Sequence, residues 1–281
     1  MNRRDCTEFL QWCLPQLRMR WAGFRRVRGQ VCKRIDRRIR ALGLSGIDAY
    51  RAWLEAHPGE WAVLDGLARV TVSRFYRDAA VFDRLEHTVL PACAGAATER
   101  EPRTVRLASL GCGSGEEPYS ISLLWQLRLK SRLPQVGLEI RAMDADPHLL
   151  RRARRACFPA GSMKELPADL RAGGFTEASE GLSLRPEMRR PVAFVRADVR
   201  DGIRGGPYDI VLCRNLVFTY FDEWLQARVG GMIAETLRPG GLLVIGRHER
   251  LPAALPFAPD PCEPCVHRRA EHDAAKAVST P

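Results

Sequence analysis

The chain has 281 residues, of which 46% are hydrophobic and 27% are charged, and its formal net charge is +11. A chain of this length and composition can bury one full α/β core together with a smaller domain, which excludes a disordered protein. No apolar run approaches the length of a membrane helix and the first residues lack a signal-peptide core, so we expect a cytoplasmic protein without membrane insertion. The excess of positive charge favours an anionic partner, for which an acidic protein surface and a nucleic acid both qualify.

The first quarter of the chain shows helical patterns only. Breaks rich in glycine and proline separate four predicted helices, over residues 6–21, 24–42, 47–56 and 60–68. We therefore predict an all-helical domain over residues 1–78.

The predicted helix 24–42 combines an apolar stripe with a basic face. Val31, Ile35 and Ile39 recur at helical spacing, and the excess of arginine lies between them. This basic face is either a docking surface for an acidic partner or an ordinary solvated surface.

A glycine-rich loop follows the first strand-like run, at residues 107–119. Gly111, Gly113 and Gly115 alternate before a helix that opens with Glu116 and Glu117. Glycine allows a sharp turn and close approach of the backbone to a ligand, although a purely structural turn from strand to helix also uses it. Carboxylates at the helix start would repel a pyrophosphate, so the pattern indicates a cationic or zwitterionic ligand such as S-adenosylmethionine.

Strands and helices alternate after the glycine loop. A second strand over 139–146 ends in Asp144 and Asp146, and an acid at this position grips ribose hydroxyls in nucleotide-binding sheets. Asp146 also suits a cap for the helix that begins at Pro147. Further strands are predicted over 208–215 and 237–246, and this order is typical of class I methyltransferases.

Residues 79–281 are therefore predicted to form a Rossmann-like α/β methyltransferase domain. Short alternating runs at 182–184 and 192–195 predict a small β insertion over about 158–195. A last strand is predicted near 265–267.

The nine cysteines are expected to be reduced thiols. Their number is odd, and four of them fall in predicted helices or strands as small core residues: Cys32, Cys112, Cys157 and Cys213.

A C-x-x-C pair near the C-terminus raises the question of a zinc site. Cys262 and Cys265 have the spacing of two zinc ligands, with His267 and His272 close behind. A second ligand pair at the proper spacing is missing, so we expect no metal.

Several motifs together identify a family resemblance. Residues 34–44 read R-I-D-R-R-I-R-A-L-G-L, 71–77 read T-V-S-R-F-Y-R, and 115–120 read G-E-E-P-Y-S. C-R-N at 213–215 precedes Y-F-D at 220–222. In these segments the chain resembles the CheR-type protein-glutamate O-methyltransferases of bacterial chemotaxis, and the resemblance extends over roughly residues 24–269.

This resemblance implies a site for S-adenosylmethionine. Arg77 would hold the methionine carboxylate or the acceptor carboxylate, and Tyr220 would lie beside the reacting methyl group. Together with the glycine loop, the implied cofactor-binding residues are Thr71, Ser73, Arg77, Gly111, Gly113, Glu117, Asp144, Asp198, Val199, Cys213, Arg214 and Asn215.

Three segments depart from the family pattern. One additional residue stands before Tyr220, so Thr219 could take part of its place, and Gly246-Arg247-His248-Glu249 replaces G-H-S-E. The stretch 12–21 also differs from the family's opening helix. These departures concern the acceptor side more than the cofactor.

Three hypotheses for the function follow. The first is a monomeric protein-glutamate methyltransferase whose residues Arg34, Arg38 and Arg40 dock an acidic helix, such as the cytoplasmic domain of a chemoreceptor, with no nucleic-acid partner. The second is a carboxyl or hydroxyl methyltransferase for a small molecule. The third is a non-catalytic regulatory module that binds the cofactor and a partner.

Overall fold

The structure, a computed structural model, describes residues 3–71, 73–261 and 263–270 and forms two compact units. Residues 1–72 and 216–226 belong to the first, here called the helical unit, and residues 73–215 and 227–281 to the second, the sheet unit. The helical unit thus includes residues 216–226, which in sequence lie between the strands 208–213 and 237–245 of the sheet unit. Within the described residues, no helix is both long and apolar enough to cross a membrane.

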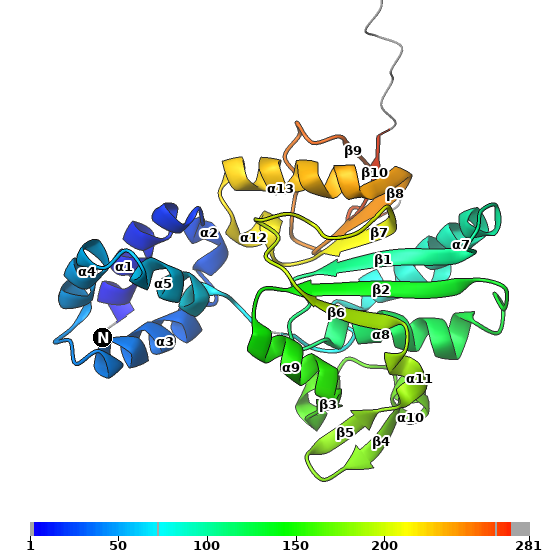
Figure 1. Cartoon of the computed structure of the whole chain (residues 1–281), viewed down its shortest axis with the longest axis horizontal. Helices are drawn as coiled ribbons and strands as arrows, with labels where there is room; N and C mark the ends of the chain where they lie inside the picture. Colours follow the sequence, from blue (N-terminus) through cyan, green and yellow to red (C-terminus); the bar gives the residue numbers. More distant parts are fainter. Residues whose placement is uncertain (1–2, 72, 262, 271–281) are drawn as a thin grey trace, which may run out of the picture. The chain divides into compact units, whose positions relative to one another are not determined.

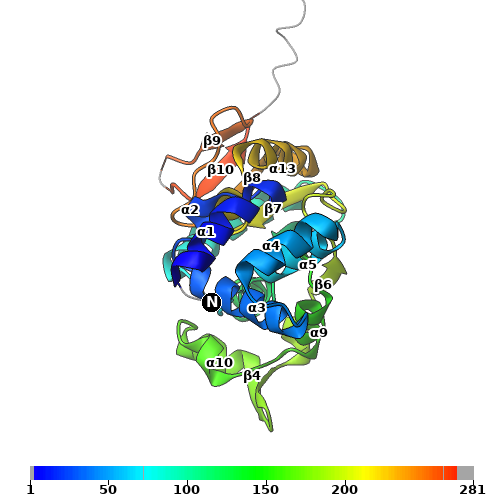
Figure 2. The same cartoon turned by 90° about the vertical axis from the view of Figure 1, so that its left-hand side faces the viewer.

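Short helices make up the helical unit (Figure 2). Their bounds are α1 Arg3–Cys13, a 3₁₀ helix Pro15–Leu17, α2 Trp21–Phe24, α3 Arg28–Ala41, α4 Ile47–Ala56, α5 Glu60–Ala68 and α12 Val217–Tyr220. The predicted helices 47–56 and 60–68 are confirmed at both ends. The apolar stripe of α3 is also confirmed, since Val31, Ile35 and Ile39 are buried.

The two other helix predictions were too long. The predicted helix 6–21 ends at Cys13, because Pro15 has no N–H to continue the ladder and Arg18 adopts a left-handed conformation with φ 58°. The predicted helix 24–42 is divided, with α2 ending at Phe24 and α3 starting at Arg28.

A disulfide joins Cys6 of α1 to Cys32 of α3, which contradicts the expectation of a reduced Cys32. The pairing could not be predicted across a sequence separation of 26, because a helical pattern does not say which helices pack together. Six cysteines are free among the described residues: Cys13, Cys93, Cys112, Cys157, Cys213 and Cys265.

The sheet unit is a Rossmann-like α/β fold (Figure 1). Its seven strands stand in the order β6-β2-β1-β7-β8-β10-β9, and the first five pair in parallel, as in doubly wound nucleotide-binding folds. An antiparallel hairpin, β9–β10, forms the edge beyond β8. The strands are β1 Thr104–Leu110, β2 Gly137–Asp144, β6 Val192–Arg196, β7 Tyr208–Cys213, β8 Leu237–Ile245, β9 Phe257–Pro259 and β10 Val266–Arg269.

Helices connect these strands. Those that bear on the site are α8, which starts the run after the glycine loop, and α9, which packs on β2 and β6. The helix bounds are α6 Ala79–Arg84, α7 Leu90–Thr98, α8 Glu116–Leu124, α9 Pro147–Arg155, α10 Ala168–Gly174, α11 Pro186–Arg189 and α13 Glu223–Thr236, with π-helical turns at Leu85–Val89 and Trp125–Leu129 and a 3₁₀ helix at Ala160–Met163.

A separate three-stranded sheet forms the β insertion. Its order is β3-β5-β4, with β3 Cys157–Phe158, β4 Phe175–Ala178 and β5 Gly181–Leu184. The predicted run 182–184 lies in this sheet, as expected. The run 192–195 does not: it forms β6, which pairs in parallel with β2 at the edge of the main sheet.

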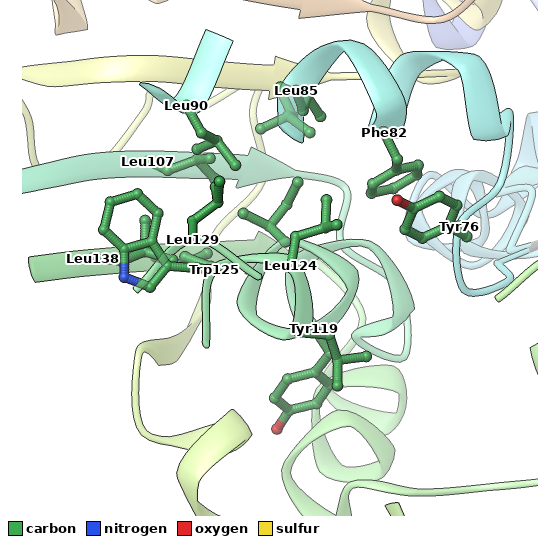
Figure 3. Close-up of a cluster of buried hydrophobic side chains, with 14 of the residues drawn as sticks. Tyr76, Phe82, Leu85, Leu90, Leu107, Tyr119, Leu124, Trp125, Leu129 and Leu138 are labelled. Atoms are coloured by element: carbon green, nitrogen blue, oxygen red, sulfur yellow. The ribbon is translucent and has the colours of Figure 1, made fainter. Parts of the chain in front are cut away.

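Large apolar side chains fill the core of the sheet unit (Figure 3). Trp125, Leu124 and Leu129 pack with Leu107 of β1 and Leu138 of β2. Every residue of β7 is buried, as expected for a central parallel strand covered on both faces. The carboxyl ends of β1 and β7, from which the site loops start, are therefore buried.

Candidate functional site

The central pair of strands, β1 and β7, sets the place of the site. From β1 the chain continues to β2 on one side, whereas β7 continues to β8 on the other. Doubly wound sheets bind ligands at such a switch point, in the crevice beyond the carboxyl ends of the strands. The glycine loop follows β1 and Arg214 follows β7, so both predicted motifs lie at this point.

Asp144 fastens the glycine loop to the end of β2. Its carboxylate accepts a hydrogen bond from the main-chain N–H of Gly113 at 2.8 Å and another from the N–H of Asp146 at 2.8 Å. The carboxylate therefore lies beside the loop, at the position that binds ribose hydroxyls in such folds. Gly113 has φ 57°, which favours glycine, and Ser73 is the side chain nearest to a Cβ built there, at 3.6 Å.

Asp146 caps α9, as the second of its two predicted roles requires. Its side chain accepts from the N–H of His148 at 2.7 Å and of Leu149 at 3.4 Å. Of the two acids after β2, Asp144 is therefore the one at the loop.

The two glutamates at the start of α8 have internal partners. Glu116 is 3% exposed and accepts from the Ser114 hydroxyl at 3.0 Å. Glu117 accepts from the Ser109 hydroxyl at 2.8 Å and from Arg214 at 3.0 Å. Glu116 is thus a buried acid with its partner inside the glycine loop, whereas Glu117 joins β1 to Arg214.

Arg214 is a buried hub between three segments. Its guanidinium donates to Glu117 at 3.0 Å, to Asp78 at 2.8 Å and to the carbonyl of Arg77 at 2.7 Å. Its Cζ lies 5.3 Å from the ring centre of Phe82, which stacks on Tyr76 (Figure 3). The side chain is 2% exposed, and its charge-assisted hydrogen bonds join segment 73–78 to the start of α8.

Arg77 points its guanidinium at the end of β7. It donates to the side-chain oxygen of Asn215 at 3.0 Å, and the N–H of Asn215 donates to Glu249 at 2.9 Å. Glu249 also accepts from the N–H of Gly246. Sequence reasoning missed the roles of Asp78 and Glu249. Glu249 could have been noticed in the sequence, because it is the last residue of the segment 246–249 that replaces the family's G-H-S-E.

Asp198, Val199 and Cys213 complete the set within the sheet unit. Asp198 follows β6 and forms an ion pair with Arg200 at 2.7 Å, so its charge is partly balanced inside the chain. Val199 and Cys213 are buried.

Thr71 and Tyr220 belong to the helical unit. The Thr71 hydroxyl accepts from Arg34 at 3.4 Å. The Tyr220 ring packs edge-on against Phe24, with centroids 5.1 Å apart.

The three arginines proposed for docking differ in their contacts. Arg34 donates to the carbonyls of Leu67 and Arg69, and Arg38 makes a bidentate pair with the buried Glu60 at 2.8 and 2.7 Å. Arg40 pairs with Asp36 on the surface of the same helix. Arg34 and Arg38 are thus engaged within the unit.

A family model for the "CheR methyltransferase, SAM binding domain" matches residues 71–259, which span the glycine loop, Asp144 and Arg214. The chain belongs to the CheR methyltransferase family. It is accordingly an enzyme that uses S-adenosylmethionine as methyl donor, and the family resemblance predicted from the motifs is confirmed.

Relatives with curated names agree. The "Probable biofilm formation methyltransferase WspC" of Pseudomonas aeruginosa is 33% identical over 76% of this chain, and the match spans 50% of that relative's length. A chemotaxis protein methyltransferase of Listeria monocytogenes is 31% identical over 66% of this chain and 67% of its own. The "Chemotaxis protein methyltransferase 2" of Vibrio cholerae is 30% identical over 79% of this chain and 77% of its own.

The residues present fit this cofactor. The hydrogen bond from Gly113 holds the Asp144 carboxylate beside the loop where ribose hydroxyls bind in such sheets. No group of His, Cys, Asp and Glu suited to a metal ion occurs in the described part of the chain. Cys262, one half of the C-x-x-C pair, lies outside the described residues.

Proposed function

We propose that this methyltransferase esterifies glutamate side chains on an acidic helix of a chemoreceptor-like protein, acting as a monomer in the cytoplasm. The observation that carries the proposal is Arg77, whose guanidinium lies at the end of β7 on Asn215, 3.0 Å away. A planar cation at the switch point suits a carboxylate, either of the acceptor or of the cofactor. Relatives named as chemotaxis protein methyltransferases support the same acceptor.

A glutamate acceptor simplifies the chemistry. Its carboxylate is ionised near neutral pH, so an oxygen can attack in line once it is oriented. The cofactor supplies the methyl group on a positively charged sulfur. The chain then has to orient the acceptor and exclude water, and Arg77, Asn215 and Tyr220 are the residues proposed for that. His248, which a hydroxyl acceptor would need as a base, is exposed.

We propose a smaller docking face on α3 than the three arginines Arg34, Arg38 and Arg40, and the exposure of its side chains supports this. Lys33, Arg37 and Arg40 follow at i, i+4 and i+7 on one exposed side of this helix. The Arg40–Asp36 pair is a surface pair that an incoming carboxylate can replace at little cost. We therefore assign docking to Lys33, Arg37 and Arg40 in place of Arg34 and Arg38.

The acceptor can be identified with labelled cofactor. The protein is incubated with methyl-labelled S-adenosylmethionine and the purified cytoplasmic domain of a chemoreceptor encoded in the same genome. Label that base releases as volatile methanol indicates a methyl ester on the protein, as proposed. Label found on small molecules of a cell extract, or no transfer at all, would favour the two other hypotheses.

The docking face is tested by reversing its charge. Lys33→Glu with Arg37→Glu should raise the KM for the receptor domain and leave the affinity for S-adenosylhomocysteine unchanged. The rate of this double variant should also depend less on salt than the wild-type rate does. The control is Lys130→Glu with Arg132→Glu, an equal change of charge at exposed residues before the amino end of β2. Equal effects of both pairs would show that only net charge matters and would contradict docking on α3.

A further inference from the structure

The turn that carries Tyr220 is held by contacts with the N-terminal part of the chain. Residues 216–226 belong to the helical unit, although they follow β7 directly in sequence. Within that unit Met19 and Phe221 form an antiparallel bridge, and the N–H of Asp222 donates to the carbonyl of Arg18 at 2.9 Å. The stretch 18–24, which overlaps the end of the stretch 12–21 that differs from the family's opening helix, is thus the partner of the Tyr220 turn.

Arg20 closes the C-terminal end of α12. Its main-chain N–H donates to the carbonyl of Tyr220 at 2.8 Å, and its guanidinium donates to the carbonyl of Thr219 at 3.1 Å and to that of Phe218. The last carbonyls of a helix have no partner within the helix, and they carry partial negative charge. One arginine therefore supplies donors to three consecutive carbonyls of a one-turn helix that could not persist alone.

Gly23 allows this contact to form. A Cβ placed on Gly23 would lie 2.3 Å from the carbonyl oxygen of Thr219 and 3.1 Å from the Tyr220 ring. A Cβ atom cannot approach an oxygen to 2.3 Å, and this oxygen belongs to the main chain, so it cannot turn away as a flexible side chain could. Next to it, the buried Phe24 packs edge-on against the Tyr220 ring at 5.1 Å.

We propose that Arg20 and Gly23 are positioning residues for methyl transfer, because they hold the turn 217–222 in the conformation that presents Tyr220. This inference rests on the role proposed above for Tyr220. We call the contacts of Arg20 and Gly23 with this turn the clamp. The clamp gives the helical unit a part in turnover in addition to docking, because it acts on Tyr220 and not on the acceptor helix.

The test compares kinetics for Arg20→Ala, Arg20→Lys and Gly23→Ala with the receptor domain as acceptor. Arg20→Ala should lower kcat by about tenfold or more, as expected for the loss of charge-assisted hydrogen bonds that orient a reacting group. Gly23→Ala should lower kcat as well, because its Cβ would displace the carbonyl of Thr219. KM for S-adenosylmethionine should stay within about twofold, because the glycine loop lies in the other unit. Arg20→Lys should recover part of kcat, since an ammonium still reaches a carbonyl.

Two controls separate positioning from general damage. Gly29→Ala lies inside α3, where a Cβ would meet no atom within 4 Å, so it should keep the wild-type kcat. Hydrogen exchange should quicken in the peptide 216–224 for Arg20→Ala and Gly23→Ala, and not for Gly29→Ala.

The outcomes distinguish this inference from the function on which it rests. If Tyr220→Phe loses turnover while Arg20→Ala and Gly23→Ala keep it, the clamp is wrong and the role of Tyr220 stands. If Tyr220→Phe keeps the wild-type kcat, the role of Tyr220 is wrong and the clamp inference falls with it. A loss of S-adenosylhomocysteine binding in Arg20→Ala as large as the loss of kcat would also overturn positioning.

Discussion

Arg77 offers a substitution at the scale of a single side chain whose effect can be separated from folding. Arg214 donates to the main-chain carbonyl of Arg77 at 2.7 Å. Truncation of the Arg77 side chain therefore leaves this hydrogen bond of the buried Arg214 in place. Arg77→Ala should lower kcat/KM for methyl-ester formation by about tenfold to a hundredfold, the effect of losing one charge-assisted contact. The matched control is Arg74→Ala, which removes an exposed pair with Glu165 and should leave the rate unchanged. A wild-type rate for Arg77→Ala would remove Arg77 from the site.

Glu60 is expected to make the stability of the helical unit depend on pH in acid. Its pKa is lowered below the ordinary 4.5, first by the hydrogen bonds from Arg38 and further by the Tyr50 hydroxyl, against an opposing effect of burial. A lowered pKa means that the stabilisation is complete above the ordinary value and is lost as the pH falls through the pKa of the folded state.

The prediction is that the free energy of unfolding of the helical unit declines as the pH drops below about 4.5. Glu60→Gln should cost about 1.5 to 3 kcal/mol at pH 7 and show a smaller further loss in acid. Urea unfolding followed by tryptophan fluorescence measures this, because every tryptophan except Trp125 lies in the helical unit. An unchanged slope against pH in Glu60→Gln would mean that other carboxylates control the acid response.

At the scale of an element, the start of α8 depends on Gly115. This residue has φ +96°, and a Cβ there would lie 3.1 Å from Ala153 and from Phe194. Alanine would combine a left-handed backbone, which costs about 1 to 2 kcal/mol, with displacement of α8 from α9. The glycine loop would shift with α8, because both belong to one turn.

Gly115→Ala should therefore weaken binding of S-adenosylhomocysteine by about tenfold or more, measured by calorimetric titration. The control is Gly161→Ala, in the 3₁₀ helix of the β insertion, where a Cβ would meet nothing within 4 Å. In the same experiment the wild type should bind S-adenosylhomocysteine and not NAD. Unaltered binding by Gly115→Ala would show that the loop does not depend on the packing of α8.

At the scale of the whole molecule, the two units should respond separately to the loss of the disulfide. Cys32→Ser opens the loop closed by Cys6 and Cys32, which are 26 positions apart, and the chain-entropy relation gives a loss of about 3.5 kcal/mol in the stability of the helical unit. Affinity for S-adenosylhomocysteine should be unchanged, since the glycine loop and Asp144 lie in the sheet unit. Cys157→Ser, at a free cysteine of the sheet unit, is the control. Reduction of the wild-type disulfide should lower the free energy of unfolding of the helical unit as much as Cys32→Ser does. If reduction leaves this free energy unchanged, the disulfide contributes little to the stability of the unit.

Much of the fold could be predicted from the sequence because it depends on neighbouring residues. The bounds of α4 and α5 follow from glycine and proline breaks, and the buried β7 from an apolar run. The glycine loop likewise reflects the conformational needs of Gly113 and Gly115, whose φ angles are 57° and 96°. The motifs that identify the family are local for the same reason, since each occupies a few consecutive residues.

The tertiary structure alone decided which distant residues meet. Arg20 donates to Thr219 across 199 residues of sequence, and Arg34 and Arg38 turn to partners inside the helical unit instead of remaining on an open basic face. A pattern records which side of a helix is apolar, but not which charged side chain finds an acid or a carbonyl after packing. For that reason the cofactor could be predicted from the motifs, whereas the contacts of Arg20 and Gly23 with the Tyr220 turn became visible only once α12 was seen in the helical unit.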